Sequence, residues 1–429
     1  MMTSFDVIVV GAGPGGIAAA SVAADAGLRV CLLDDNPTPG GQIWRGFRST
    51  SACKYPHGNT YLEWTRRLER TSCEVWSGWQ ATDRLDSSIL RVERDGEVRD
   101  LGFRKLILAT GARERFLPFP GWTLPGVMGA GGLQALVKSG LDVRGKRVVI
   151  AGTGPLLLAV AAGLAHSGAR VEGIYEQARL SQLFKFGLKL TRHPEKLVEG
   201  ARYRRKTLGA PYCTSRWVSR AEGGGRIESV TVTDGRKEWT HGCDLLACGF
   251  HLVPNLELPG LLGCRITNGF VGVDSLQQSS VEGICCVGEL TGIGGLEKAL
   301  VEGEIAGWAA AGRLDRANPL STRVHRLRKF ADQMERAFAP RDELRALLRT
   351  ETLVCRCEDV THGALKECGS WREAKLQARC GMGACQGRVC GAATEFLYGW
   401  QAASVRPPVF PAAVSTVAES SDAQVPIHS

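Results

Sequence analysis

The 429-residue sequence lacks an apolar run of membrane-spanning length and has no segment typical of a signal peptide. Met1-Met-Thr-Ser-Phe5 leads directly into an apolar run that we interpret as a β-strand. We therefore expect no membrane span and no export, and we predict a cytoplasmic protein whose membrane contact, if any, is peripheral and made through an electron acceptor. Without export, cysteines stay reduced, so the fifteen cysteines do not predict a disulfide framework.

The sequence also lacks the concentrated basic patch of a nucleic-acid-binding protein. Its formal charge of +9 is spread along the chain, and the densest basic stretch, residues 323–349, also contains acidic residues. A solvated helix face explains that stretch, and a docking surface for an acidic partner is the alternative. With 44% apolar and 23% charged residues, the composition indicates a globular protein long enough for two or three domains.

Residues 5–34 have the strand-helix-strand pattern of a nucleotide-binding unit. The turn between the first strand and the helix reads Gly11-x-Gly13-x-x-Gly16, and a carboxylate, Asp34, ends the second strand. This fingerprint predicts a dinucleotide whose pyrophosphate meets the helix N-terminus and whose ribose hydroxyls bond the carboxylate. A purely structural glycine turn is the alternative. The predicted binding residues are Gly11, Gly13, Pro14, Gly16 and Asp34.

The same design recurs over residues 146–176, which indicates an internal duplication of the nucleotide-binding unit. Gly152 and Gly154 form the turn and Glu176 ends the second strand, but Leu157 replaces the third small residue. Glu176 would bind a ribose and would repel the 2′-phosphate of NADP. The second unit is predicted to hold an adenine nucleotide, NAD or ATP, or else to be a retained structural repeat, and we expect no fast hydride exchange with NADPH.

Four cysteines near the C-terminus have the spacing of metal ligands: Cys355-x-Cys357 and Cys385-x4-Cys390. Four thiolates suit a [2Fe–2S] cluster or zinc. The first pair is tighter and the second looser than common zinc knuckles, which favours the cluster; zinc and cluster-free cysteines are the alternatives. Cys380 is a second choice in place of Cys385. Neighbouring glycines would let backbone N–H groups approach the cluster, and they are Gly381, Gly383 and Gly387.

Later segments favour FAD as the first dinucleotide. Ala109-Thr-Gly-Ala112, Gly288-Glu289 and Gly292-Ile-Gly-Gly295 resemble motifs of the flavoproteins with two dinucleotide-binding domains, the α/β fold of glutathione and thioredoxin reductases. The resemblance implies that Glu289, usually Asp in relatives, holds the ribityl chain and that the following helix N-terminus faces the isoalloxazine ring. The further FAD residues that it implies are Gly41, Gln42, Arg45, Thr110, Gly111, Gly288, Glu289 and Gly294.

Nearly the whole chain resembles the FAD-containing α subunits of bacterial opine and D-hydroxyproline dehydrogenases and of hydrogen cyanide synthase. The segments that carry the resemblance are residues 34–45, 152–155, 253–258, 262–264, 292–295 and the cysteine module. The module resembles [2Fe–2S] domains of the bacterioferritin-associated ferredoxin type, an arrangement shared with the α subunit of sarcosine oxidase. In such complexes the β subunit is itself a flavoprotein, similar to D-amino-acid oxidase, and oxidises a secondary amine. The resemblance implies this partner, and it admits a small γ subunit.

The predicted function is electron relay by an FAD and [2Fe–2S] oxidoreductase subunit of a heteromeric dehydrogenase that oxidises a secondary amine or amino acid, such as an opine or D-hydroxyproline. The sequence does not fix the direction of electron flow. The alternatives are a self-sufficient NAD(P)H-dependent flavin oxidoreductase and a non-catalytic metal-binding sensor or assembly subunit. No catalytic acid or base is assigned, because a flavin relay requires none.

The domain limits predicted from these patterns divide the chain into six segments. They are residues 1–118 and 251–312 for the two parts of the FAD-binding domain, 119–250 for the second nucleotide-binding-like domain, 313–350 for a helical connector, 351–400 for a small α-helical [2Fe–2S] domain, and 401–429 for an extended arm with a disordered tail.

Overall fold

The computed structural model describes residues 3–47, 57–191, 193–401 and 405–418. The chain divides into two compact units, each described by itself below. The first consists of Met1–Ala112, Pro254–Ala331 and Ser404–Ser429, and the second of Arg113–Val253 and Asp332–Ala403.

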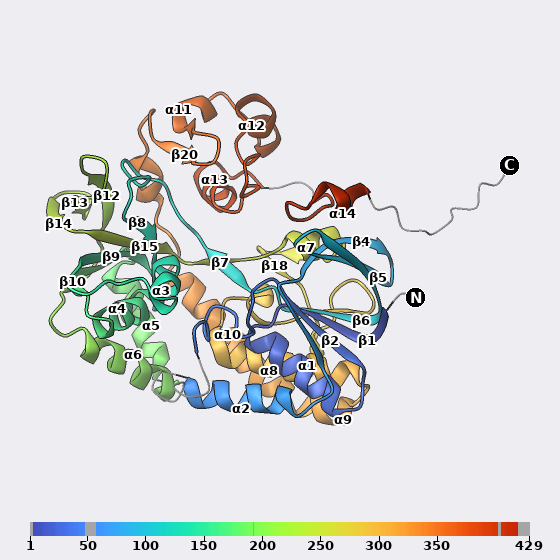
Figure 1. The fold of residues 1–429 in the computed structure, drawn as a ribbon. Coiled ribbons are helices and arrows are strands. Elements are labelled where there is room, and N and C mark those ends of the chain that lie inside the picture. Colours follow the sequence, from blue (N-terminus) through green and yellow to red (C-terminus); the bar gives the residue numbers. More distant parts are fainter. Residues whose placement is uncertain (1–2, 48–56, 192, 402–404, 419–429) are drawn as a thin grey trace. The chain divides into compact units, whose positions relative to one another are not determined.

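A seven-stranded sheet forms the centre of the first unit (Figure 1). Its strands are β1 (Thr3–Val10), β2 (Val30–Asp34), β3 (Glu74–Ser77), β4 (Gln80–Asp86), β5 (Ile89–Arg94), β6 (Glu97–Leu108) and β19 (Ile284–Cys286). The order is β3-β2-β1-β6-β5-β4, with β19 also paired to β6. Strands β1, β2, β3, β6 and β19 pair in parallel, whereas β4 and β5 add an antiparallel extension. The parallel strands are rich in Val, Ile and Leu because both faces are covered: α1 (Pro14–Asp25), α2 (Gly58–Glu69) and α8 (Gly295–Ala310) pack on one, and the β4–β5 extension with α7 (Glu257–Leu261) contributes to the core on the other.

Two helices of the first unit pack against each other unusually closely. Helix α1 (Pro14–Asp25) connects β1 to β2, and α8 (Gly295–Ala310) follows β19 (Figure 1). A Cβ atom on Gly307 would lie 2.7 Å from the Ala19 carbonyl oxygen, and one on Gly303 would clash with that of Gly15. The small residues of both helices are therefore a packing requirement. The remaining elements are α2 (Gly58–Glu69), α7 (Glu257–Leu261), β17 (Ile266–Thr267), β18 (Phe270–Val271), η2 (Gly288–Thr291), α9 (Leu314–Ala317) and η3 (Asn318–Leu320).

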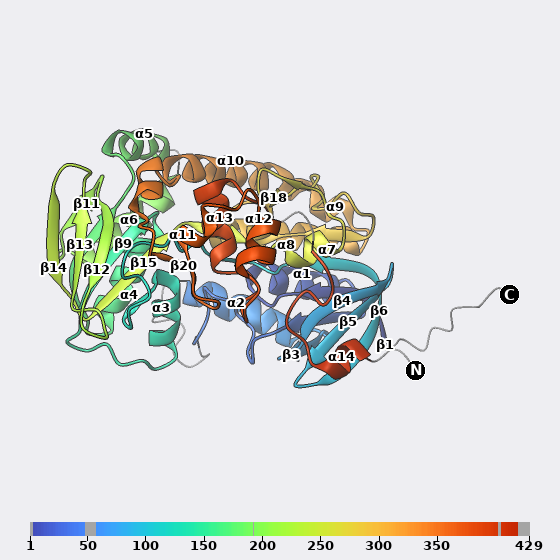
Figure 2. The ribbon, with the colours of Figure 1, turned by 90° about the horizontal axis from the view of Figure 1, so that it is seen from above.

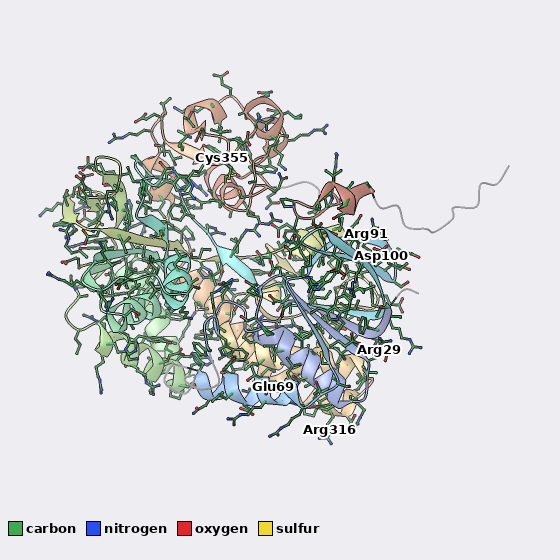
Figure 3. The ribbon with its side chains drawn as sticks, viewed as in Figure 1. Arg29, Glu69, Arg91, Asp100, Arg316 and Cys355 are labelled. Atoms are coloured by element: carbon green, nitrogen blue, oxygen red, sulfur yellow. The ribbon has the colours of Figure 1, made fainter. Side chains whose placement is uncertain are left out.

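The arm after residue 404 packs on the antiparallel extension of the first unit. It contains the short helix α14 (Val414–Ala418). The Arg91 guanidinium donates to both carboxylate oxygens of Asp100, at 2.8 and 2.9 Å, and to the Thr416 carbonyl at 3.1 Å (Figure 3). The Thr416 hydroxyl donates to Glu93 at 2.6 Å. The tail predicted to be disordered after residue 418 lies outside the described residues.

The second unit repeats the strand-helix-strand design on a five-stranded parallel sheet, in the order β11-β10-β9-β15-β8. The strands are β8 (Val127–Gly129), β9 (Arg147–Thr153), β10 (Arg170–Glu176), β11 (Tyr212–Thr214) and β15 (Leu245–Phe250). Helices α3 (Ala130–Lys138), α4 (Leu156–His166), α5 (Leu180–Leu190) and α6 (Pro194–Lys206) accompany them. An antiparallel sheet contains β12 (Trp217–Glu222), β13 (Ser229–Thr233) and β14 (Glu238–Gly242), and β7 (Ala112–Glu114) pairs with β16 (Leu252–Pro254).

The cysteine module follows α10 (Ser321–Ala337) and η4 (Asp342–Leu347). Its elements are β20 (Leu353–Cys355), β21 (Val360–Thr361), α11 (His362–Leu365), α12 (Trp371–Ala378) and α13 (Cys390–Tyr398), gathered around a small core of its own (Figure 2). Hydrogen bonds fasten it to the rest of the second unit. The Trp122 indole donates to the Leu353 carbonyl at 2.7 Å, and the Arg113 guanidinium donates to the Arg388 carbonyl at 3.1 Å.

Within the part of the chain that the structure describes, no helix combines the length and the apolar character needed to cross a membrane.

Candidate functional site

The first glycine turn joins β1 to α1 and is shaped to receive a phosphate group. Gly11 has a φ of +103°, and a Cβ atom there would clash with the Ala109 carbonyl. A Cβ atom on Gly16 would clash with the Gly11 carbonyl. The first turn of α1 can therefore pack this closely against the end of β1 only because position 16 has no side chain. At Gly13, by contrast, a Cβ atom would meet no described atom within 4 Å. The turn thus leaves open space beside the first N–H groups of α1, which begins at Pro14.

Asp34 ends β2 beside this turn, as the fingerprint predicts. Its Oδ2 accepts a hydrogen bond from the Ala12 backbone N–H at 2.5 Å, and its Oδ1 accepts two from Asn36, each of 2.8 Å. The residue keeps a 6% exposed edge. Its carboxylate is therefore held at the turn, in a residue that keeps a small exposed surface.

The glycine-rich loop after β2 passes directly over the first turn. Gly41 has a φ of +58°, and a Cβ atom there would lie 2.9 Å from the Gly13 Cα atom. The Arg45 guanidinium donates to the Asn36 side-chain oxygen at 2.8 Å and to the Gln42 side-chain oxygen at 3.2 Å. The structure thus brings Gly41, Gln42 and Arg45 to the same place as the turn and Asp34.

The turn after β6 is fixed by Asn255, which sequence reasoning did not assign. The Asn255 side chain donates to the Thr110 carbonyl at 2.7 Å, and its backbone N–H donates to the Gly111 carbonyl at 3.0 Å. The Thr110 hydroxyl donates in return to the Asn255 carbonyl at 3.1 Å. The signal was present, because Asn255 lies in one of the segments that carry the family resemblance.

Glu289 turns its carboxylate onto the N-terminus of α8. Its two oxygens accept hydrogen bonds from the backbone N–H groups of Gly294 at 3.0 Å and Gly295 at 2.9 Å. Burial raises the pKa of the Glu289 carboxyl, and the charge of Lys298 opposes that rise. The resemblance implied that this residue holds a ribityl chain; here its oxygens have backbone partners, and the ribityl contact stays a prediction.

A buried ion pair holds the loop at Gly288 in place. Sequence reasoning did not assign a role to either of its residues. Lys298 and Glu302 stand one helical turn apart on α8, with side chains 1% and 0% exposed, and their charged atoms lie 2.8 Å apart. Glu302 Oε2 also accepts from the Gly288 N–H at 2.9 Å and from the Thr291 hydroxyl at 2.7 Å. Its other oxygen accepts from Arg328 at 3.0 Å. Each buried charge is thus satisfied by several hydrogen bonds.

At the second glycine turn, Glu176 is completely buried. Its Oε1 accepts from the Thr153 hydroxyl and the Ala178 N–H, each at 2.8 Å, and its Oε2 accepts from the Gly154 N–H at 2.7 Å. The residue is 0% exposed, and burial raises the pKa of its carboxyl to about 7. In contrast to Asp34, Glu176 therefore has no accessible edge.

The cover over Glu176 is the segment Phe338–Arg341, which follows α10. The Thr153 hydroxyl lies 3.1 Å from the Phe338 carbonyl, and the Gln177 side chain donates to the Ala339 carbonyl at 3.1 Å. The Arg341 N–H donates to the Gln177 side-chain oxygen at 3.1 Å. The chain's own connector thus binds the residues that surround this turn.

Five thiols gather in the cysteine module (Figure 3 labels Cys355). The Sγ atoms of Cys355, Cys380 and Cys390 lie within 4.8 Å of one another, and these residues are 1%, 0% and 1% exposed. Cys357 and Cys385 are hydrogen-bonded to each other and are less buried. Two of the four ligands predicted from the sequence, Cys355 and Cys390, thus lie in one buried group with Cys380, and the roles of Cys357 and Cys385 stay a prediction.

Backbone N–H groups converge on these sulfur atoms. Burial raises the pKa of the Cys355 thiol, and the backbone N–H groups of Gly381, Glu358 and Cys357 oppose that rise. The pKa of Cys385 is lowered against the effect of burial by the N–H groups of Val389, Gly387 and Arg388 and by Cys357. The Cys385 N–H likewise acts to lower the pKa of Cys357, which is raised overall. The glycines permit this approach, since a Cβ atom on Gly383 would clash with that of Cys357 and Gly381 has a φ of +78°. N–H groups directed at sulfur stabilise thiolates, which are the metal-binding form of cysteine. The donor set therefore fits an iron–sulfur cluster or another thiophilic metal.

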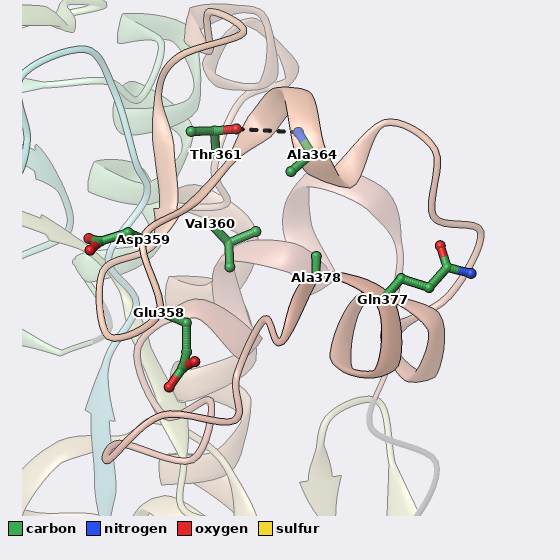
Figure 4. A pocket seen from close by; sticks show the side chains of 7 residues that line it. All are labelled: Glu358, Asp359, Val360, Thr361, Ala364, Gln377 and Ala378. Atoms are coloured by element: carbon green, nitrogen blue, oxygen red, sulfur yellow. Dashed lines mark hydrogen bonds between the residues drawn. The ribbon is translucent and has the colours of Figure 1, made fainter.

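The surface of the module also has a pocket of about 300 Å³ that contains none of these sulfurs (Figure 4). It is lined by Glu358, Asp359, Val360, Thr361, Ala364, Gln377 and Ala378. The Glu358 carboxylate accepts from Arg379 at 2.7 Å, so one of the two acidic groups already has a cationic partner. None of the binding residues predicted from the sequence lines this pocket.

Known proteins similar to this chain include an oxidoreductase family, subunits of two bacterial enzymes and a solved dehydrogenase structure. The model of the pyridine nucleotide-disulphide oxidoreductase family matches residues 5–313. Hydrogen cyanide synthase subunit HcnB of Pseudomonas aeruginosa is 33% identical over 89% of this chain and 90% of its own length. An opine oxidase subunit of Rhizobium meliloti is 33% identical over 97% of this chain and 99% of its own length. The structure of L-proline dehydrogenase from P. horikoshii superposes with a TM-score of 0.70 at 18% identity, covering 97% of this chain and 80% of that one.

These similarities confirm the α/β fold with two dinucleotide-binding domains and the resemblance to the opine and hydrogen cyanide synthase subunits. They also confirm that the chain is a flavin-dependent oxidoreductase subunit. The chain therefore belongs to the pyridine nucleotide-disulphide oxidoreductase family.

Proposed function

We propose that this chain binds FAD and a [2Fe–2S] cluster and relays electrons within a heteromeric dehydrogenase that oxidises a secondary amine or amino acid. The single observation that carries the proposal is the buried group of thiols, with sulfur atoms within 4.8 Å of one another, in a chain that also has a complete dinucleotide turn. When bound, FAD supplies two-electron hydride chemistry and the cluster supplies one-electron transfer. A protein holding both is suited to splitting electron pairs.

Each group of residues has a distinct part in this proposal. Gly11, Gly13 and Gly16 shape the turn for a pyrophosphate, and Asp34 offers its accessible edge to a ribose. Cys355, Cys357, Cys385 and Cys390 are the proposed cluster ligands. In our proposal the FAD-binding domain consists of residues 1–118 and 251–312, and residues 351–400 form the [2Fe–2S] domain.

We further propose that the second unit holds no adenine nucleotide and serves to bind the connector. Glu176 is 0% exposed, and the segment Phe338–Arg341 covers the turn, so no surface of this carboxylate is accessible to a ribose. This arrangement disfavours a self-sufficient NAD(P)H-dependent enzyme. Calorimetric titration of the chain with NAD, NADH and ATP should detect no binding. Tight binding of any of these nucleotides would contradict the proposal that the second unit is closed.

The partner in our proposal is a second flavoprotein subunit, similar to D-amino-acid oxidase, that oxidises the amine, and a small γ subunit would complete the complex. Support comes from the relatives, which are named as subunits of hydrogen cyanide synthase and of opine oxidase. We propose a cytoplasmic location, because metal-binding thiols must stay reduced.

Co-purification from the native host with cofactor analysis tests the proposal. We expect one FAD, two irons and two acid-labile sulfides on this chain, together with a second flavoprotein. Zinc in place of iron would contradict the cluster. A stable monomer with full amine-oxidising activity would contradict the complex.

A further inference from the structure

Helix α5 of the second unit, which packs against α6, exposes a row of large apolar side chains (Figure 1). Leu180, Phe184 and Leu188 are 65%, 67% and 59% exposed. Because they follow one another at intervals of four residues, they line up along one face of the helix. Apolar side chains exposed together in this way indicate a surface that binds another apolar surface.

A different face of α5 fixes the helix to the second unit. Phe186 is 8% exposed, and its ring packs edge-on against that of Phe338, with 5.3 Å between the ring centroids. Leu183 and Leu190 share this face and are partly buried. The exposed row thus lies outside the face by which α5 is held.

Positive charge is concentrated around the exposed row. Residues 179–206 contain nine Lys and Arg and two Glu, a formal net charge of +7 in a chain of +9. The basic stretch 323–349 has a smaller net charge, because its eight basic residues accompany four acidic ones. Five basic side chains of residues 179–206 are exposed and form no ion pair within the part of the chain that the structure describes: Lys185, Lys189, Arg202, Arg205 and Lys206.

The chemistry of this surface fits an anionic lipid bilayer better than a protein partner. The basic residues that directly follow Phe184 and Leu188 are both Lys, which is depleted at the cores of protein interfaces. At a bilayer, apolar side chains enter the region below the headgroups while Lys side chains extend toward the lipid phosphates. Anionic lipids attract basic residues that come within about 8 Å, the screening distance at physiological salt.

We propose that α5 and α6, residues 179–206, bind the surface of a bilayer that contains anionic phospholipids. Leu180, Phe184 and Leu188 enter the bilayer surface, and the Lys and Arg side chains contact the headgroups. This contact is made by the chain itself and requires no membrane-spanning helix. It depends neither on the proposed cluster nor on the proposed partner subunit.

Flotation of the full-length chain with lipid vesicles tests the proposal. Vesicles of phosphatidylglycerol and phosphatidylcholine in equal parts are compared with vesicles of phosphatidylcholine alone. We expect the chain to float with the anionic vesicles, to be released from them by high salt, and to stay in solution with phosphatidylcholine alone.

Two double variants separate the charges from the apolar row. Lys185→Gln with Lys189→Gln should weaken binding to the anionic vesicles about 30-fold, because each basic residue near such a surface contributes about fivefold to affinity. Phe184→Ser with Leu188→Ser should weaken binding by about tenfold or more, because two apolar side chains no longer enter the bilayer.

Other exposed positions of the chain supply matched controls. Arg326→Gln with Lys329→Gln removes the same charge from exposed positions of α10. Leu376→Ser removes a 71% exposed apolar side chain from α12. Both control proteins should bind the anionic vesicles as the wild type does. Circular dichroism checks that each variant is folded, and the salt dependence of the wild type tests the proposal without any variant.

Three results would overturn the inference. The wild type could remain in solution with the anionic vesicles at low salt, or bind phosphatidylcholine alone equally well. The two α5 variants could bind as tightly as the wild type, which would place the contact elsewhere. Finally, if the wild type binds no vesicles and the α5 variants lose a second subunit in gel filtration, the surface is a protein interface.

Discussion

Replacing Glu176 by Gln tests whether the second glycine turn is closed by the protein itself. The carboxyl is 0% exposed, and burial raises its pKa from 4.5 to about 7. Between these two pH values the folded protein holds a proton that the unfolded chain has lost. The resulting stabilisation is fully present below about pH 4.5 and is lost as the pH rises through about 7.

The magnitude follows from the pKa difference. Since each pKa unit is worth about 1.4 kcal/mol, a rise from 4.5 to about 7 corresponds to about 3 kcal/mol. Glu176→Gln has no titrating group at this position. The quantity to compare is the difference between the two free energies of unfolding, wild type minus Glu176→Gln. This difference should fall by about 3 kcal/mol between pH 4.5 and pH 7.5.

The assay is denaturant unfolding of both proteins across this pH range, followed by tryptophan fluorescence. Glu222→Gln is the matched control, because the side chain of Glu222 is 56% exposed in the same unit and forms a surface ion pair with Arg220. Curves for the wild type and Glu176→Gln that stay parallel from pH 4.5 to pH 7.5 would refute the reasoning, since a solvated carboxylate gives that result.

Three further predictions concern the cysteine module, the buried ion pair of α8 and the carboxylate at the first glycine turn. Cys385→Ser should remove the iron and leave FAD bound, as metal analysis and the flavin spectrum would show; loss of both would mean that the module and the flavin domain are not separable. Lys298→Met should destabilise the chain by about 3 kcal/mol, because it leaves the buried Glu302 charge without its main partner, and adding Glu302→Gln should recover part of the loss in thermal unfolding. Asp34→Ala should weaken FAD retention during gel filtration while iron stays bound, and retention equal to the wild type would contradict its ribose role.

The local patterns of the chain were readable from sequence because their chemistry depends on near neighbours. The turn from Gly11 to Gly16 requires glycines wherever a Cβ atom would collide, and Asp34 follows at the spacing that one strand-helix-strand unit imposes. The paired spacing of the cysteines likewise pointed to Cys355 and Cys390, two of the three thiols that the structure brings together. Each of these signals is contained within about thirty residues.

The features that sequence reasoning missed depend on contacts between distant segments. Asn255 reaches the Thr110 turn across 145 positions, and Phe338 reaches Thr153 across 185. Spacing along the chain does not predict such contacts; for Asn255 the family resemblance marked the segment but not its partner. Cys380 was ranked second to Cys385 because it stands beside Arg379 before a glycine turn, whereas the structure brings its sulfur to those of Cys355 and Cys390.

The most direct test of the central claim is analysis of the anaerobically purified chain for iron, acid-labile sulfide and paramagnetism. Our account predicts two irons and two sulfides per chain and a paramagnetic signal after reduction with dithionite. A protein that shows only the yellow flavin spectrum, contains no iron and stays silent after reduction would contradict it.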